Sequence, residues 1–214
     1  MTSLIKNIIF DLGGVLLDLD FQKPFLAFQK LNRNGKISDL KQFLHHPVFL
    51  ELETGAISPE DFRQQIRLLL KNEDIKDEEI DQAWCSMLIE VPPLKVSLLQ
   101  ELAGEYRIFL FSNTNAIHIP DFSAKFFNQH QVNWESLFEK TFYSHEIRDR
   151  KPNESAYKKV ISLAGIHPSE TLFIDDLEQN IQSAVQAGLN VIHFVPGGNL
   201  REEIHRVLGP DILL

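Results

Sequence analysis

The stretch that decides the fold is IIFDLGGVLLD, residues 8–18. It begins within a short, mostly apolar segment, Ile5–Phe10, which is rich in β-branched side chains and is followed by Asp11. A short apolar, β-branched run of this kind is typical of a strand that is buried on both faces of a sheet. Gly13 and Gly14 then allow the tight loop that such a strand end requires. The stretch therefore predicts a buried strand that breaks into a loop directly after a carboxylate.

Four later segments have the same character, and helical patterns separate most of them. The predicted strands are Arg107–Phe111, a shorter one at Thr141–Tyr143, Thr171–Ile174 and Asn190–Val195. The predicted helices are Leu94–Ala103, Ser155–Ala164 and Leu177–Ala187, which stop at Gly104, Gly165 and Gly188. Glycine is a common residue just after a helix end. This alternation predicts an α/β fold with a Rossmann-like, doubly wound parallel sheet and helices on both faces.

Residues 19–89 interrupt this rhythm with helical periods and without a convincing strand. The predicted helices are Phe21–Leu31, Ile37–His46, Pro59–Lys71 and Asp77–Leu88, with Ser58 and Asp61 as an N-terminal cap of the third. We expect a helical cap domain over 19–89, inserted into a core domain made of residues 1–18 and 90–214. The segment Asn113–Leu137 is expected to be a loop with short helices.

Composition excludes several classes of protein. The 214 residues carry a net charge of −9, which argues against a nucleic-acid partner but allows a small anionic substrate in a local positive pocket. The single cysteine, Cys85, allows no disulfide within the chain and is expected to pack in a core. No signal-like segment and no apolar run of about 20 residues is present, so we expect a cytoplasmic protein that does not enter membranes.

Four separated motifs place polar residues at strand ends or in loops on the same side. They are IIFDLGGVLLD (residues 8–18), FLFSNTN (109–115), RKP (150–152) and FIDDLEQN (173–180). Ligands of open parallel sheets bind beyond the carboxyl ends of the strands. We therefore expect Asp11, Ser112, Lys151 and the pair Asp175-Asp176 to meet at one edge of the sheet.

In this order the motifs resemble those of the haloacid dehalogenase superfamily of aspartyl-phosphate phosphatases, and the helical insert is similar to that superfamily's C1 cap. The resemblance covers essentially the whole chain. Within the superfamily, the motifs are most similar to the branch of sugar-1-phosphate phosphatases and the N-terminal phosphatase domain of soluble epoxide hydrolases. The resemblance implies a phosphohydrolase that needs Mg²⁺ and acts on a small phosphorylated metabolite.

The resemblance also implies a role for each motif residue. Asp11 is the expected nucleophile, because a carboxylate can take up a phosphoryl group and so split one difficult displacement into two easier steps. The expected Mg²⁺ ligands are the carboxylates of Asp11 and Asp176 and the backbone carbonyl of Gly13. Lys151 would stabilise negative charge on the phosphoryl group, Asp175 would orient Lys151, and Pro152 would begin a helix that fixes this lysine. The expected phosphate donors are the Ser112 hydroxyl and the backbone N–H groups of Leu12, Gly14 and Asn113.

Gly13 departs from the family pattern. Most phosphatases of this superfamily carry a second aspartate there, which protonates the leaving oxygen and then activates water. Such acid–base help contributes about 10²–10⁴-fold in rate. Its absence favours a substrate whose leaving group needs little protonation, such as a sugar 1-phosphate.

Gly13 also keeps two other readings open. One is a catalytically weak protein that binds or senses a phosphometabolite, and the other is a dehalogenase or phosphonatase. Among the remaining polar residues, we expect Asp18 to brace the cap hinge and Asn180 to pack on its helix, and we leave His118 open between a loop histidine and a substrate contact. The cap residues Phe21, Phe49 and Glu53–Gly55 are candidates for substrate contact or for core and hinge roles.

Overall fold

The computed structural model describes residues 4–33 and 43–209, which contain a five-stranded parallel sheet with the strand order β3-β2-β1-β4-β5. The strands are β1 (Asn7–Phe10), β2 (Arg107–Ser112), β3 (Lys140–Tyr143), β4 (Thr171–Asp175) and β5 (Asn190–His193). All four pairings are parallel, so the carboxyl ends of the strands share one edge. The chain runs from β1 to β3 on one side and returns to β4 on the other. The strand order therefore reverses between β1 and β4, where ligands of doubly wound sheets bind.

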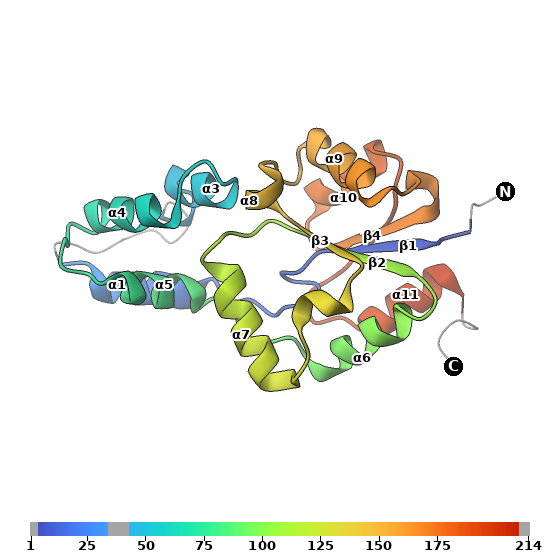
Figure 1. Ribbon diagram of the computed structural model, residues 1–214, viewed down its shortest axis with the longest axis horizontal. Coiled ribbons are helices and arrows are strands. Elements are labelled where there is room, and N and C mark those ends of the chain that lie inside the picture. Colours follow the sequence, from blue (N-terminus) through green and yellow to red (C-terminus); the bar gives the residue numbers. More distant parts are fainter. Residues whose placement is uncertain (1–3, 34–42, 210–214) are drawn as a thin grey trace.

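Helices cover both faces of the sheet, as predicted (Figure 1). One face carries α6 (Pro93–Leu102), α7 (His118–His130) and α11 (Leu200–Leu208), and the other carries α9 (Glu154–Ala164) and α10 (Glu178–Gln186). Shorter helices are η1 (Trp134–Leu137), α8 (Ser144–Ile147) and η2 (Pro168–Glu170). Among the described helices, none combines the length and the apolar character needed to cross a bilayer.

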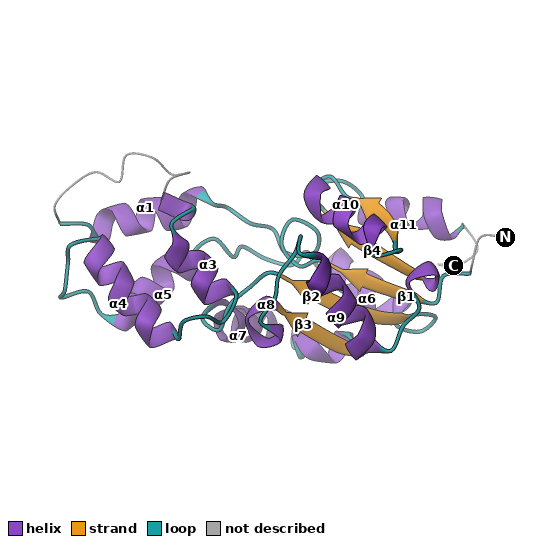
Figure 2. Ribbon diagram, turned by 90° about the horizontal axis from the view of Figure 1, so that it is seen from above, coloured by secondary structure: helices purple, strands orange, loops and turns teal. Residues whose placement is uncertain are grey.

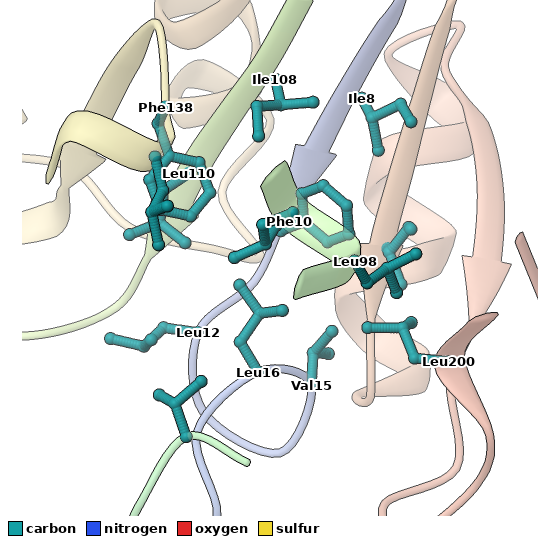
Figure 3. Packing of buried hydrophobic residues seen from close by; sticks show 14 of the residues in the cluster. Ile8, Phe10, Leu12, Val15, Leu16, Leu98, Ile108, Leu110, Phe138 and Leu200 are labelled. Carbon is teal, nitrogen blue, oxygen red and sulfur yellow. The ribbon is translucent and has the colours of Figure 1, made fainter. Parts of the chain in front are cut away.

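Alternate residues of β1 explain why both faces are apolar. Ile8 and Phe10 belong to one buried cluster, and Ile9 belongs to the cluster on the opposite face. Figure 3 shows Phe10 beside Leu98 of α6, in the cluster that also contains Ile8 and Leu200 of α11. The strand β1 pairs with β2 and β4 and is covered by helices on both faces. Its carboxyl end at Asp11 is therefore held in place and is accessible only from beyond the ends of the strands.

The cap lies beyond the carboxyl ends of the strands and has an aromatic core of its own (Figure 2). Its described helices are α1 (Gln22–Leu31), α3 (Pro47–Glu53), α4 (Pro59–Leu69) and α5 (Asp77–Cys85). Phe49 sits at the centre of this core, with its ring centroid 4.6–6.4 Å from those of four other aromatic residues: Phe28, Phe43, Phe62 and Trp84. This separate core supports the proposed division of the chain near residues 19 and 89.

Two antiparallel linker segments join the cap to the sheet. Leu19 bridges to Leu88, and backbone hydrogen bonds pair Asp18 with Ile89 and Glu90 at 2.9–3.0 Å. The Asp18 carboxylate also lies 3.2 Å from Lys95 Nζ at the start of α6. These contacts agree with the prediction that Asp18 braces the hinge, and they join the two linkers into one connection.

Several sequence predictions need correction. The segment Asn113–Leu137 contains the 13-residue helix α7 as well as η1, because its aromatic residues Phe122 and Phe126 pack at helical spacing into the core. The helices before Gly104, Gly165 and Gly188 end as predicted, and Gly165 and Gly188 have a left-handed backbone, whereas Gly104 does not.

In the cap, the prediction at Ile37–His46 falls mostly outside the described residues. Sequence reasoning did not predict α3, where His46 accepts a hydrogen bond from the Val48 N–H and acts as the N-terminal cap. The predicted capping box of Ser58 and Asp61 is confirmed.

Replacing Phe49 by alanine should destabilise the cap, because the aromatic core would lose its central ring. Such truncations typically cost about 3–5 kcal/mol. Urea unfolding followed by tryptophan fluorescence measures the loss, and Leu50→Ala is the matched control because Leu50 is 44% exposed. Equal unfolding curves for the two variants would contradict a separate aromatic core around Phe49.

Candidate active site

A buried lysine between two carboxylates forms the centre of the site. Lys151 Nζ lies 2.8 Å from Asp11 Oδ1 and 2.6 Å from Asp175 Oδ2. Asp11 follows β1, Asp175 ends β4, and Lys151 comes from the loop after α8. The side chains of Lys151 and Asp175 are 1% and 0% exposed. The structure thus brings together the three residues that the motifs predict.

The hydrogen bonds of Asp175 explain how it holds Lys151. Asn180 Nδ2 donates to both carboxylate oxygens at 2.9 and 3.1 Å, and the Leu177 N–H donates to Oδ1 at 2.9 Å. Lys151 completes this set of donors. Because each oxygen already accepts at least two hydrogen bonds, Asp175 is better placed to orient Lys151 than to bind a cation directly. Asn180 is buried, so its packing role includes a polar one that sequence reasoning missed.

The backbone around Lys151 is fixed by Asn113. Asn113 Nδ2 donates to the Lys151 carbonyl at 2.9 Å, and Asn113 Oδ1 accepts from the Lys151 N–H at 3.0 Å. The prediction that Pro152 begins a helix is wrong. Asn153 is the N-cap, and α9 begins at Glu154. The lysine is therefore positioned by a side-chain amide from the second motif.

Burial and charge set the protonation of these groups. Burial raises the pKa of Asp11 to about 7, although Lys151 acts in the opposite direction. Burial also opposes the charge of Lys151, but Asp11 and Asp175 outweigh it and hold the pKa of Lys151 above its usual value. For Asp176, burial and the neighbouring Asp175 raise the pKa. The site therefore holds more negative than positive charge.

A divalent cation fits this shortage. Carboxylate oxygens of Asp11, Asp175 and Asp176 lie within 4.8 Å of one another, and three carboxylates around one ammonium leave two formal negative charges. Hard divalent cations prefer such oxygen ligands. Gly14 lets Asp176 approach the loop after β1, because a Cβ at Gly14 would lie 2.4 Å from Asp176 Oδ2. Asp11 and Asp176 are therefore the carboxylates best placed to share a cation.

The predicted phosphate donors have different positions in the structure. The Leu12 N–H donates to Asp11 Oδ1 at 2.6 Å, and Ser112 ends β2 as a buried residue. The Gly14 N–H donates to the Leu17 carbonyl at 2.9 Å, which argues against Gly14 as a phosphate donor. Gly14 instead contributes the space that Asp176 occupies.

A charged pair beside this centre joins the cap to the core. Glu53 ends α3, and its Oε1 lies 3.2 Å from Arg150 Nε, one residue before Lys151. Ser144 Oγ of α8 lies 2.6 Å from the Glu53 carbonyl oxygen, which docks the end of α3 on the core. The sequence motifs alone could not identify Arg150 or Ser144 as contacts of Glu53, because these residues meet across the boundary between cap and core.

The other candidates fall into structural roles. His118 is buried and stacks on Trp84 with the ring centroids 4.7 Å apart, and burial lowers the pKa of His118 to about 3. This neutral ring joins α7 to the cap. Phe49 lies in the aromatic core, and Cys85 is buried, as expected for a packing residue. Phe21 is 53% exposed at the start of α1.

Comparison with known proteins identifies the family. Residues 5–188 match the model of the haloacid dehalogenase-like hydrolases, and the chain belongs to this family. A D-ribitol-5-phosphate phosphatase of Bacteroides thetaiotaomicron is 31% identical, over 96% of this chain and 99% of the relative. A sesquiterpene phosphatase of Aspergillus oryzae is 26% identical, over 98% of this chain and 100% of the relative. The chain is an enzyme of the phosphatase type in this family.

Solved structures agree with this assignment. A crystal structure of a haloacid dehalogenase family enzyme from Bacteroides thetaiotaomicron has a TM-score of 0.89 at 35% identity, covering 94% of this chain and 99% of that one. The wild-type form of that enzyme, solved in complex with magnesium and inorganic phosphate, has a TM-score of 0.84 at 37% identity, covering 91% and 96%. An L-2-haloacid dehalogenase from Xanthobacter autotrophicus, at 19% identity and a TM-score of 0.61, shares the fold.

Gly14→Ala should weaken cation binding, because its Cβ would collide with Asp176 Oδ2 and the residue has a φ of +77°. We expect the Mg²⁺ concentration for half-maximal activity to rise by about tenfold or more, equivalent to at least about 1.4 kcal/mol. Gly165→Ala is the control, since Gly165 has a φ of +61° and no described atom within 4 Å of its added Cβ. An unchanged Mg²⁺ requirement in Gly14→Ala would contradict the role given to this glycine.

Mg²⁺ affinity should depend on pH through Asp11. Since burial raises the pKa of Asp11 to about 7, a cation must displace a proton below that pH. Affinity should therefore fall by about tenfold for each pH unit below 7 and level off above it. Calorimetric titration in two buffers of different ionisation enthalpy measures the proton released. A constant affinity between about pH 5.5 and 7 would contradict this shift.

Proposed function

We propose that this phosphatase is an Mg²⁺-dependent phosphomonoesterase that hydrolyses a small phosphorylated sugar or polyol through an aspartyl phosphate at Asp11. The observation that carries the proposal is the buried contact of Lys151 with both Asp11 and Asp175. In this contact a carboxylate and a buried positive charge lie together at the strand ends where the sheet order reverses. That combination suits the capture of a phosphoryl group.

The residues present fit Mg²⁺. Asp11 and Asp176 would supply carboxylate oxygens, and Gly13 would supply its backbone carbonyl. The ion would neutralise charge between the nucleophile and the phosphate when bound. The solved enzyme with 37% identity, crystallised with magnesium and inorganic phosphate, supports this choice of cation.

The chain's own groups would then position the phosphate. The Ser112 hydroxyl and the backbone N–H of Asn113 are the proposed donors to its oxygens. The Leu12 N–H, which donates to Asp11 Oδ1 at 2.6 Å, would exchange that bond for one to the phosphate. Lys151 would stabilise the negative charge that develops on the equatorial oxygens during transfer. Asp175 would keep Lys151 in place, supported by Asn180.

The substrate class rests on two different arguments. The missing side chain at Gly13 favours an activated ester such as a sugar 1-phosphate. The relative named as a D-ribitol-5-phosphate phosphatase, at 31% identity over nearly the whole chain, favours a polyol ester of a primary alcohol. Both point to a small polyhydroxy phosphate. The net charge of −9 fits such a metabolite better than a nucleic acid, and we place the reaction in the cytoplasm.

The other readings of the sequence fit less well. A binding or regulatory protein is favoured only by Gly13, whereas both whole-length relatives described above are named as phosphatases. The resemblance to dehalogenase structures, at 19% identity or below, concerns the fold. The carboxylate cluster of Asp11, Asp175 and Asp176 further favours phosphate chemistry with a cation.

Hydrolysis of p-nitrophenyl phosphate and of a panel of phosphorylated sugars and polyols tests the proposal. We expect activity that depends on Mg²⁺ and is abolished by chelation. Asp11→Asn should lower kcat by at least about 10³-fold, because the amide cannot serve as the nucleophile. Asp18→Asn, at the hinge, is the control. Activity of Asp11→Asn close to that of the wild type would refute the proposed nucleophile.

The same panel decides between the two kinds of ester. Glucose 1-phosphate, glucose 6-phosphate and D-ribitol 5-phosphate are compared by kcat/KM. Faster turnover of glucose 1-phosphate than of the 6-phosphate would support the argument from the leaving group. Faster turnover of the two primary esters would instead require a proton donor elsewhere in the site.

A further inference from the structure

The position that usually carries the acid–base aspartate is closed in this protein. Gly13 has no side chain, and a Cβ built there would lie 2.6 Å from Leu19 Cδ1. Leu19 itself is held in the linker by its bridge to Leu88. An apolar side chain therefore occupies the space beside Gly13, and any proton donor must come from another direction.

The geometry of phosphoryl transfer requires the proton donor to approach from the side of the cap. In phosphoryl transfer the attacking and leaving oxygens lie roughly in line with phosphorus. Asp11 attacks from the end of β1, so the leaving oxygen faces away from the sheet. Figures 1 and 2 show the cap beyond that edge, with the end of α3 next to α8. Glu53 is the last residue of α3.

Two contacts dock this end of α3 on the core. Ser144 Oγ lies 2.6 Å from the Glu53 carbonyl oxygen. Gly55 follows with a φ of +66°, and a Cβ there would lie 2.4 Å from the His145 carbonyl oxygen. The turn after Glu53 therefore lies against α8. The loop that carries Lys151 begins directly after this helix.

The Glu53 side chain is directed into this boundary. It is 23% exposed, and its Oε1 is buried and, among the described atoms, accepts no hydrogen bond. Arg150 Nε lies 3.2 Å away without a hydrogen-bonding geometry. The positive charge of Lys151, which contacts Asp11, also acts on this carboxylate. Glu53 thus retains free hydrogen-bonding capacity beside Arg150, the residue that precedes Lys151.

We propose that Glu53 is the general acid and base of this enzyme and replaces, from the cap, the aspartate that is missing at Gly13. In the first step, Asp11 Oδ forms a bond to phosphorus while the bond between phosphorus and the ester oxygen breaks. The Glu53 carboxyl gives its proton to that leaving oxygen. In the second step, the Glu53 carboxylate takes a proton from water as the water oxygen bonds to phosphorus, and the bond from phosphorus to Asp11 breaks.

The surroundings of Glu53 suit both halves of this cycle. Burial raises the pKa of Glu53, with Arg150 and Lys151 as the charged groups acting in the opposite direction. Burial thus favours the protonated form needed for the first step. Arg150 stabilises the carboxylate that remains after proton transfer and is needed for the second. The assignment rests on the proposed phosphatase function and goes beyond it by naming the residue that handles the proton.

The test compares Glu53→Gln with the wild type on two leaving groups. With p-nitrophenyl phosphate, whose leaving group needs no proton, the variant should release a burst of p-nitrophenol equal to the number of sites. Steady turnover should then slow, because the base for the second step is missing. With D-ribitol 5-phosphate, whose alkoxide needs a proton, no burst of ribitol should appear, and kcat should fall by about 10²–10⁴-fold.

Glu51→Gln is the matched control, because it makes the same change in the same helix and should keep wild-type rates. The burst amplitude counts folded sites, so misfolding would lower the amplitude without changing the rate of the burst. An equal slowing of the first step for both esters would overturn the proposal and assign Glu53 to substrate binding. Wild-type rates for the variant on the polyol ester, or a wild-type enzyme that hydrolyses only activated esters, would also overturn it. If the proposed phosphatase function itself is wrong, the wild-type enzyme will hydrolyse neither substrate. This result differs from every outcome that concerns Glu53 alone.

Discussion

The contact of one buried ammonium with two carboxylates is the constraint on which the rest of the site depends. Lys151, Asp11 and Asp175 come from three separate parts of the chain and meet where little water remains. Separating such charges in a buried place is costly, because each would lose its partner without regaining its hydration. The strands β1 and β4 and the loop before α9 are therefore tied to one arrangement.

The same contact determines how the neighbouring groups are used. Asn180 and the Leu177 N–H saturate Asp175, and Asn113 holds the backbone of Lys151. Asp11 and Asp176 are left with uncompensated negative charge. The site therefore suits a cation and a phosphate bound together. The positive charge of the cation would offset the negative charges of Asp11 and Asp176 and of the phosphate.

The boundary between core and cap divides the proposed chemistry. The core supplies the nucleophile and the fixed positive charge, while Leu19 closes the space beside Gly13. The cap brings Glu53 to the opposite side of the phosphate. In this arrangement protonation of the leaving group depends on the docking of α3, so that the cap would both shape the substrate pocket and complete the reaction.

The sequence by itself determined the sheet, the order of the motifs and the meeting of Asp11, Lys151 and Asp175 at one edge. These follow from local rules, because apolar runs predict buried strands and parallel strands share their carboxyl ends. Local rules failed where a residue's role is set by distant neighbours. The Gly14 N–H is taken by Leu17, and Asn113 binds the lysine backbone.

Only the tertiary structure shows which residues of the cap and the linkers lie at the site. Nothing in the spacing of residues around Glu53 indicates that it meets Arg150, which is almost 100 positions away in the chain. The filling of the space at Gly13 by Leu19 likewise depends on how the two linkers pair. Such contacts arise where the cap, with its own buried cluster, packs against the core. Periodicity within either part carries no information about the surface that they share.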